Sequence, residues 1–291
     1  MKKIITHINP DLDAICSVWL IKKFLPASPN RGEPGWQEAK VEFVEATSSG
    51  EEMAGVDDNP NILYVDVGRG KLDHHQTNEY LSASKLVWDF IRNERKSENV
   101  APLDEKAVER LVEVVTQIDN ARDLNWKEVK KDRYSFYLHI LIEGLRELSL
   151  DDLSVVKEGS LMLETILINL KNKIRAEEEM KQAIKFQTPW GKAVALKTGN
   201  KHFLYFGETQ GYVLVMVKDP ESGGVRIYAR PDSKVDLSKA YDKVKKLDPQ
   251  SDWFLHSSKR LLLNNASVIK MKPTKLSLAE IIEIIKERKI K

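Results

Sequence analysis

The sequence has almost no cysteine, no long apolar run and almost no net charge. Among its 291 residues Cys16 is the single cysteine, which excludes an intramolecular disulfide and a cysteine-rich zinc site. No uncharged apolar stretch is long enough to span a membrane, and the first residues lack the apolar core of a signal peptide. The net charge is +2, so no overall field favours nucleic acid or an anionic membrane. We therefore expect a cytoplasmic protein without a membrane partner.

The spacing of apolar residues predicts an α/β protein with two domains. We expect buried strands over residues 2–7, 41–46 and 61–68. We expect helices over about 82–95, 104–120 and 133–148. Strands that alternate with helices are typical of a parallel sheet. The expected organisation is a parallel-sheet catalytic domain (1–150), a connecting helix (151–187) and a smaller mixed α/β domain (188–291).

The chain after residue 188 is predicted to be rich in strands. Four segments are apolar or alternate between apolar and polar residues: KAVALKT, HFLYF, YVLVMVK and VRIYARP. A helix is expected near 236–247, then an extended segment (LLLNNAS, 261–267) and a terminal helix near 277–289. These elements would form the second domain.

Histidine and aspartate residues gather at the ends of expected elements in the first 125 residues. Ligands of open α/β sheets bind at the carboxyl ends of the strands, so side chains at such positions are expected to converge. Any one of these residues is explained as well by turn chemistry, solvation or a salt bridge, but four segments with the same pattern are not. The residues are His7, Asp11, Asp13, Asp66, Asp73, His74, His75 and Asp119, with Asp123 as an alternative to Asp119.

The chemistry of these side chains points to hard divalent cations. Carboxylate and imidazole groups without thiolate favour Mn2+ or Mg2+, with iron or cobalt as alternatives. Six ligand candidates exceed the needs of one catalytic ion and suit two. Two such ions, about 3.5–4 Å apart, share a carboxylate and activate a water for attack on phosphorus. The sequence therefore predicts an enzyme that hydrolyses a phosphoester or phosphoanhydride bond.

The four segments together resemble the DHH phosphoesterases. The resemblance is carried by HINPDLDA (7–14), YVDVG (64–68), LDHHQ (72–76) and QIDNARD (117–123), which follow the family's order over about half of the chain. That family includes RecJ-like nucleases, oligoribonucleases, cyclic-dinucleotide phosphodiesterases and manganese pyrophosphatases. The resemblance implies two Mn2+ ions, with Mg2+ or Co2+ as alternatives.

The resemblance also implies a role for each residue of the motifs. His7 and Asp11 would bind one ion, Asp66 would bridge, and the second ion would be bound by Asp13, His74 and Asp119. Three further residues are implied near the chemistry. His75 would donate to the substrate phosphate or carry a proton, Asp73 would orient a histidine ring, and Asn9 would contact substrate or brace its loop.

The second domain is similar to the DHHA1 substrate-binding domain that accompanies many DHH domains. Residues 223–244 resemble its arginine strand, on which Arg226 and Arg230 would face the same side and contact a phosphate or carboxylate. The alternative is that these basic residues only cover an exposed sheet face. His256 matches the motif histidine, but the segment 252–267 lacks the glycine cluster that precedes it in the family.

The expected substrate is a nucleotide, a dinucleotide or a short oligonucleotide. The alternatives are an exonuclease acting on single-stranded nucleic acid, a polyphosphate or pyrophosphate hydrolase, and a non-catalytic nucleotide-binding regulatory module. The resemblance argues mildly against a pyrophosphatase, because the family's pyrophosphatases have a longer segment where this chain has only seven residues from Asp66 to Asp73. The sequence leaves open whether two copies of the chain form a homodimer. His139 and His202 are expected on a helix face and in a loop, without a role in the site.

Overall fold

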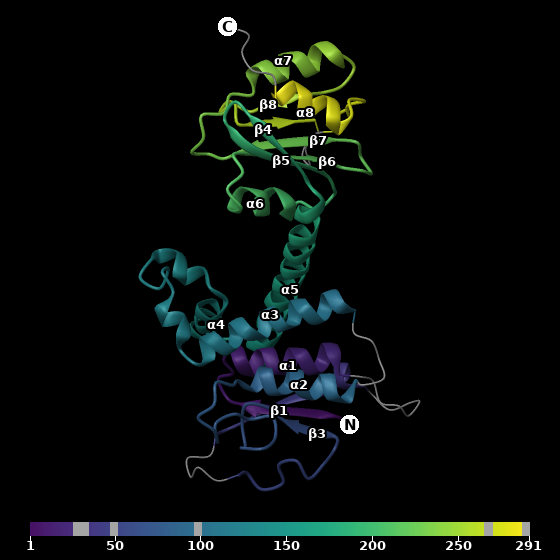
Figure 1. Ribbon diagram of the computed structural model, residues 1–291. Coiled ribbons are helices and arrows are strands. Elements are labelled where there is room, and N and C mark those ends of the chain that lie inside the picture. The colour runs from purple at the N-terminus through teal and green to yellow at the C-terminus, as the bar shows by residue number, and fades with distance from the viewer. Residues whose placement is uncertain (26–34, 47–51, 96–100, 265–269, 287–291) are drawn as a thin grey trace. The chain divides into compact units, whose positions relative to one another are not determined.

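The chain folds into two compact units, each with its own sheet (Figure 1). The computed structural model describes residues 1–25, 35–46, 52–95, 101–264 and 270–286. The first unit comprises Met1–Lys171 and the second Asn172–Lys291. The helix α5, Asp152–Gln182, runs from the first into the second. Within the described ranges, no helix is both long and apolar enough to cross a bilayer.

The sheet of the first unit has three parallel strands in the order β2-β1-β3. These strands are β1 (Lys3–His7), β2 (Lys40–Val44) and β3 (Ile62–Tyr64). The third strand is shorter than the predicted segment 61–68, because the chain leaves the ladder after Val65 and Asp66 adopts a left-handed φ of 56°. All carboxyl ends of parallel strands lie at one edge. His7 and Asp66 are therefore brought to the same edge.

Helices cover this sheet, and α1 is the most deeply buried of them. The helices are α1 (Leu12–Phe24), α2 (Ala83–Glu94), α3 (Pro102–Asp119), α4 (Leu138–Glu147) and the first part of α5, with short 3-10 turns η1 (Trp36–Glu38), η2 (Arg122–Asn125) and η3 (Asp132–Phe136). Cys16 and Trp19 are in the core, as expected. Gly159 of α5 lets that helix approach α1, since a Cβ there would lie 2.9 Å from Ile15.

The second unit is built on a mixed sheet of six strands in the order β4-β5-β6-β7-β9-β8. Among its described strands, only β5 and β6 pair in parallel. Helix α6 (His202–Thr209) packs on one face, and α7 (Ser238–Leu247) and α8 (Leu278–Lys286) pack on the other (Figure 1). The strands are β4 (Ile184–Thr188), β5 (Gly191–Lys197), β6 (Leu214–Lys218), β7 (Val225–Ala229), β8 (Phe254–Leu255) and β9 (Leu261–Leu263).

Two predicted elements of this unit are wrong. The segment HFLYF is helix α6 rather than a strand, and His202 begins that helix rather than lying in a loop. Phe203, Leu204 and Gly207 are buried on one helical face, and Gly207 allows contact with Val215 on the sheet.

The helix predicted through residue 187 instead ends at Gln182, and β4 follows it as the antiparallel partner of β5. The hairpin closes where Thr188 pairs with Gly191. Residues 265–267 and 287–289, predicted as extended and helical, lie outside the described residues.

Candidate metal centre

The loop between β1 and α1 positions the first ligand candidates. His7 is the last residue of β1, and Asp11 is the N-cap of α1. The Oδ1 atom of Asp11 accepts from the backbone N–H groups of Asp13 and Ala14 at 2.9 and 3.0 Å. An Asp at this position satisfies N–H groups that have no partner within the helix. The helix start therefore fixes the orientation of the Asp11 carboxylate.

The backbone of the same loop is also held by side chains of α4 and α5. The carbonyl oxygen of Asn9 accepts from Nη2 of Arg146 at 2.8 Å, and the same guanidinium donates to the carbonyl of Pro10. The N–H of Asn9 donates to Asp152 at 3.2 Å. Asn9 is exposed and has a left-handed φ of 52°. Its contacts support the bracing role, and they are made by its main chain.

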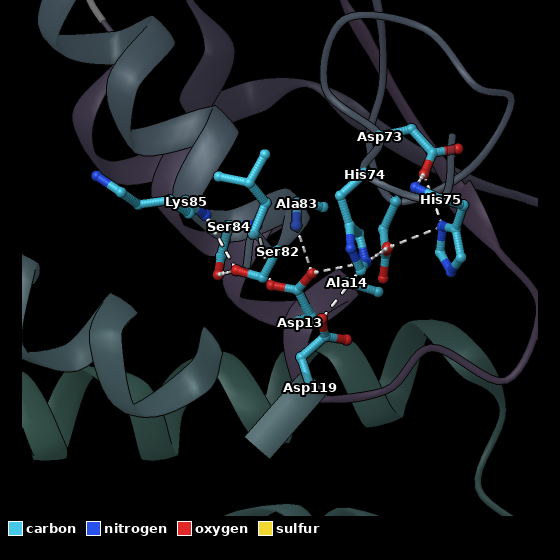
Figure 2. Close-up of polar contacts among 12 residues, drawn as sticks. Asp13, Ala14, Asp73, His74, His75, Ser82, Ala83, Ser84, Lys85 and Asp119 are labelled. Carbon is cyan, nitrogen blue, oxygen red and sulfur yellow. Dashed lines mark hydrogen bonds and ion pairs between the residues drawn. The ribbon is translucent and has the colours of Figure 1, made fainter. Parts of the chain in front are cut away.

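Asp13 is held by the first turn of α2, whose residues come from a distant part of the sequence. Its carboxylate, 1% exposed, accepts from the N–H groups of Ala83 at 2.6 Å and Ser84 at 2.9 Å (Figure 2). Burial and the nearby carboxylate of Asp66 raise the pKa of Asp13 well above its ordinary value. The partial positive charge of the helix N-terminus favours the anion. Asp13 is thus a fixed carboxylate whose Oδ2 lies 3.9 Å from Nε2 of His74.

Asp66 lies between two histidines. Its Oδ2 is 3.4 Å from Nε2 of His7, and its Oδ1 is 3.5 Å from Nε2 of His74. Burial raises the pKa of Asp66, but its contacts with both imidazoles outweigh this and lower the pKa to about 2. Burial lowers the pKa of His7, and Asp66 outweighs it, so that the pKa rises to about 9. One carboxylate is therefore shared by two imidazoles, the geometry a bridging ligand needs.

Two buried polar atoms of this cluster lack a hydrogen-bond partner within the described part of the chain. They are Oδ1 of Asp66 and Nε2 of His74. An unpaired buried polar atom costs free energy, so such atoms call for a partner. A cation between carboxylate oxygen and imidazole nitrogen would supply it. The donor set, with carboxylate and imidazole but no thiolate, fits Mn2+ or Mg2+.

Asp119 completes the second group of ligand atoms, and Asp123 does not. Asp119 ends α3 with its Oδ2 3.5 Å from Nε2 of His74, and burial raises its pKa to about 6. The buried Asp123 instead accepts from the hydroxyl of Tyr134 and lies 3.6 Å from Nε2 of His139. The structure thus distinguishes the two aspartates that the sequence left as alternatives.

All six ligand candidates fall into two groups that Asp66 connects. In each group the ligand atoms lie within 4.8 Å of one another. Ligand atoms at right angles around an ion about 2.1 Å away are about 3 Å apart, so modest closure would complete the coordination. The first group is His7, Asp11 and Asp66; the second is Asp13, His74 and Asp119; and a further set joins Asp66 to His74 and His75.

His75 differs from His74 because Asp73 holds its ring. Nδ1 of His75 lies 2.6 Å from Oδ1 of Asp73, which also accepts from the His75 N–H at 3.0 Å (Figure 2). Oδ2 of the same buried carboxylate accepts from the N–H of Arg69 at 2.7 Å. The side chain of His75 is 56% exposed. Its Nε2 is therefore left for solvent or a ligand.

The cluster is flanked by two pockets. One, about 340 Å³, is lined by His7, Asp66, Arg69 and His75 among others. The other, about 260 Å³, lies toward α3 and α4 and includes Asp13 and Asp119. Asp11 lines both. A ligand bound at the cluster can therefore extend to either side of it.

The three residues predicted to bind substrate belong to the second unit. Arg226 and Tyr228 alternate with the buried Val225 and Ile227 on β7, and Arg230 continues the alternation. Arg226 and Arg230 thus share one face. Arg230 donates to Asp232 at 3.0 and 2.5 Å. His256 is exposed in the turn between β8 and β9, with Nδ1 2.9 Å from the hydroxyl of Ser258.

Comparison with known proteins gives distant structural similarity. The chain is similar to a RecJ from Thermus thermophilus in complex with Mg2+ (11% identity, TM-score 0.32), covering 98% of this chain and 49% of that one. It is similar to an uncharacterized protein from Helicobacter pylori, with 12% identity, a TM-score of 0.24 and 98% of both chains covered. It is also similar to the DHH domain of a member of a ribosomal protein family (13%, 0.32), covering 98% and 85%.

All three matched structures are at most 13% identical to this chain, with TM-scores of 0.32 or lower. The chain spans about half the length of the RecJ structure. No family model matches the chain, and no curated protein matches it. At such TM-scores the matches carry no weight for function, which has to be inferred from the side chains themselves.

The sequence does not predict how three residues at or beside the pocket next to α4 are joined. Tyr134 received no role, Asp123 was considered only as a ligand, and His139 was expected to lie on a helix face without a function. The structure joins them in one hydrogen-bonded group beside the cluster. Tyr134 and His139 lie in an irregular turn and at a helix start, where neither spacing nor a motif marks them, and Asp123 is marked only by its place in QIDNARD.

Proposed function

We propose that this protein is a metal-dependent phosphoesterase with two divalent cations, Mn2+ in the first instance. The observation that carries the proposal is the pair of ligand groups joined by Asp66, with ion-pair distances of 3.4 and 3.5 Å to its two histidines. His7 and Asp11 would hold one ion with Asp66, and the other would be held by Asp66 together with Asp13, His74 and Asp119. Two cations bound there would supply a nucleophilic water of lowered pKa and neutralise charge on phosphoryl oxygens.

The residues around the cluster have distinct proposed tasks. Nδ1 of His75 is engaged by Asp73, so Nε2 is the atom that faces the substrate. The Asp73 carboxylate raises the pKa of His75, which favours a ring that donates a proton or a hydrogen bond to phosphate oxygen. The remaining contacts keep the geometry fixed before substrate arrives. Asp13 is held by α2, and the loop at Asn9 is held by Arg146.

The substrate we propose is a nucleotide, a dinucleotide or a short oligonucleotide. Arg226, Arg230 and His256 would contact it from the second unit, as in a DHHA1-like domain, with residues 1–150 as the catalytic domain and 188–291 as the substrate-binding domain. A second unit with two arginines on one face offers more contacts than pyrophosphate can use. The whole reaction would take place in the cytoplasm.

The test is a metal measurement followed by a substrate screen. The purified full chain is loaded with Mn2+, its bound metal is counted, and release of phosphate or nucleotide is followed. The substrates are nucleotides, dinucleotides, short oligomers, polyphosphate and pyrophosphate. We expect two ions per chain and turnover of a nucleotide-containing substrate. Fewer than two ions, or no turnover of any substrate at full occupancy, would overturn the proposal.

The same screen separates the alternatives. Stepwise shortening of oligomers from one end, with binding that weakens steeply in salt, would identify a nuclease acting on single strands. Turnover restricted to polyphosphate or pyrophosphate would identify a phosphoanhydride hydrolase. Nucleotide binding without turnover, at full metal occupancy, would identify a regulatory module.

A further inference from the structure

A hydrogen-bonded group of three side chains lies beside the cluster and supplies none of its ligand atoms. The hydroxyl of Tyr134 (η3) donates to the carboxylate of Asp123 (η2), and the same hydroxyl lies 3.0 Å from Nε2 of His139 (α4). The side chains of Asp123 and His139 are only 7% and 12% exposed. Asp123 and His139 line the pocket that Asp119 borders. Two members of this group therefore form part of the wall of that pocket.

The hydrogen bonds determine which nitrogen of His139 carries the proton. A tyrosine hydroxyl has a single hydrogen, and a carboxylate can only accept. Since Tyr134 donates its hydrogen to Asp123, its oxygen must accept from Nε2–H of His139. Burial lowers the pKa of His139, which favours the neutral ring. A neutral ring protonated on Nε2 has a free lone pair on Nδ1.

Nδ1 of His139 is buried, and the described residues offer it no hydrogen-bond partner. A buried acceptor without a donor is costly, and His139 lines the pocket, so a ligand group that reaches Nδ1 from the pocket would remove this cost. The ligand group that fits Nδ1 must bring a hydrogen, as an amino, ring N–H or hydroxyl group does. A phosphate oxygen, which only accepts, does not fit.

A second polar group of the pocket has the same preference. The exposed carboxylate of Glu143 also borders it and would repel a phosphate while accepting from amino or hydroxyl groups. Apolar side chains from α3, η2 and α4 form a further wall: Val115, Ile118, Leu124 and Ile142. A flat ring with hydrogen-bond donors on its edge matches both surfaces. Binding pockets for small molecules measure roughly 300–1,000 Å³. The volume here, about 260 Å³, suits a single compact group.

We propose that this pocket binds the nucleoside part of the substrate and that His139 accepts a hydrogen bond from the nucleobase. The inference rests on the proposed function in one respect, since the metal cluster is assigned the phosphate end. Asp11, Asp13 and Asp119 line the pocket, so a phosphate at the cluster directs its nucleoside into this space. Tyr134 and Asp123 are positioning residues, because they fix the tautomer and the angle of the imidazole.

Binding of non-hydrolysable ligands tests the inference apart from turnover. The Mn2+-loaded full chain is titrated with methylphosphonate, an abasic ribose phosphonate, and the 5′- and 3′-phosphonates of adenosine. All four share the phosphonate head and differ in what they extend into the pocket. Of the two adenosine phosphonates, we expect the one with the higher affinity to bind at least about tenfold more tightly than methylphosphonate or the abasic probe. A factor of about ten corresponds to one good hydrogen bond together with packing of the base.

Three variants test whether His139 is the source of this gain in affinity. His139→Phe keeps a ring without an acceptor and should abolish the gain while changing methylphosphonate affinity by less than about twofold, the scale of a neutral distant substitution. His139→Asn restores an oxygen near the position of Nδ1 and should recover part of it. Tyr134→Phe removes the hydroxyl that orients the ring and should give an intermediate loss. Bound metal is counted in each variant and should be unchanged.

Several results would overturn the inference. They are equal affinity for adenosine phosphonate and methylphosphonate in the wild type, equal affinity for the abasic probe, or a change in His139→Phe that is the same for all probes. Failure of the proposed function looks different. A chain that discriminates between the probes as expected but never releases phosphate would keep the nucleoside pocket and lose the enzyme.

Discussion

Oδ1 of Asp73 lies 2.6 Å from Nδ1 of His75, the shortest of the contacts that hold the two adjacent histidines. In the described part of the chain His74 has no partner this close, and its Nε2 lies 3.5 Å from both Asp66 and Asp119. The two rings are neighbours, with centroids 4.5 Å apart, but they have different surroundings. One ring faces the ligand cluster and the other is braced by a carboxylate outside it. This difference supports the different roles that we propose for the two histidines.

Replacing His75 should separate catalysis from metal binding. In His75→Ala we expect turnover to fall by about a hundredfold, the usual contribution of a proton donor or acceptor, with bound metal unchanged. The measurements are kcat and metal content on the same preparation. His139→Ala offers a matched histidine outside the cluster, for which KM should change more than kcat. Loss of metal in proportion to turnover would make His75 a ligand instead.

Asp66→Asn should remove the ligand that the two ions share, because a neutral amide cannot bridge two cations. We expect a fall in activity of about a hundredfold or more, since even residues behind metal ligands contribute about 10–100-fold. Metal counting should show fewer than two ions. Asp58→Asn, at an exposed carboxylate of the same unit, is the control and should behave as wild type. Near-normal turnover of Asp66→Asn with Mn2+ would exclude the dinuclear mechanism.

The proximity of the ligand candidates could be predicted from the sequence, because each of them lies at or near the end of an element. His7 ends β1, Asp11 lies in the loop after it and Asp66 comes shortly after β3, and parallel strands bring their carboxyl ends to one edge. The contacts that hold these ligand candidates in place could not be predicted from the sequence. Asp13 is fixed by N–H groups of Ala83 and Ser84, some seventy residues away. Such contacts depend on helix packing, which no single segment encodes.

The errors have a similar origin. HFLYF has the composition of a strand, but its segment lies over a sheet and buries residues at helical spacing. Tertiary packing overrode local propensity there. His139 could not be interpreted either, since its partners Asp123 and Tyr134 come from irregular turns that the sequence does not place.

Arg146 should stabilise the loop that carries Asp11. Its guanidinium donates to the carbonyls of Asn9 and Pro10, and removal leaves both without that donor. We expect Arg146→Ala to lower the free energy of unfolding by about 1–3 kcal/mol, the range for hydrogen bonds to charged groups, and to weaken Mn2+ binding. Denaturant unfolding and metal titration measure the two effects. Arg133→Ala, at an exposed arginine of η3, is the control. Unchanged metal affinity would show that the brace is dispensable.

Arg230 should act on substrate affinity if the second unit contacts the substrate. Its guanidinium already donates to Asp232, so the ion pair must be opened or shared when an anion binds. We expect Arg230→Ala to raise KM about tenfold with little effect on metal content or kcat. Asp232→Asn frees the guanidinium and should lower KM. A KM that neither substitution changes would remove Arg230 from the substrate site.

The metal-free protein should lose stability as the pH rises from about 6.5 to 9. In the folded chain the pKa of His7 is about 9, because Asp66 outweighs the effect of burial. The pKa of His74 also rises to about 9, through Asp66. Unfolded histidine releases its proton near 6.5. The protonated rings therefore stabilise the fold below pH 6.5, and this contribution is lost as the pH passes through 9.

The acidic groups of the cluster change the stability of the metal-free protein at lower pH. The pKa of Asp66 is lowered to about 2, through His7 and His74 against burial, so its stabilisation is present above pH 3.8 and is lost as the pH falls toward 2. Burial raises the pKa of Asp119 to about 6, so its ionisation lowers stability as the pH rises from 3.8 to 6. Between these limits the metal-free protein should be most stable in mildly acidic solution.

Manganese should reverse the alkaline part of this dependence, because metal binding requires neutral imidazole and ionised carboxylate. The Tm measured with EDTA should fall between pH 6.5 and 9, while the Tm with saturating Mn2+ should stay level or rise, so that their difference grows. His7→Gln should flatten the curve measured with EDTA, and His202→Gln, at a histidine of the second unit, should not. A difference between the two Tm values that is constant from pH 6.5 to 9 would mean that His7 and His74 hold no proton for the metal to displace.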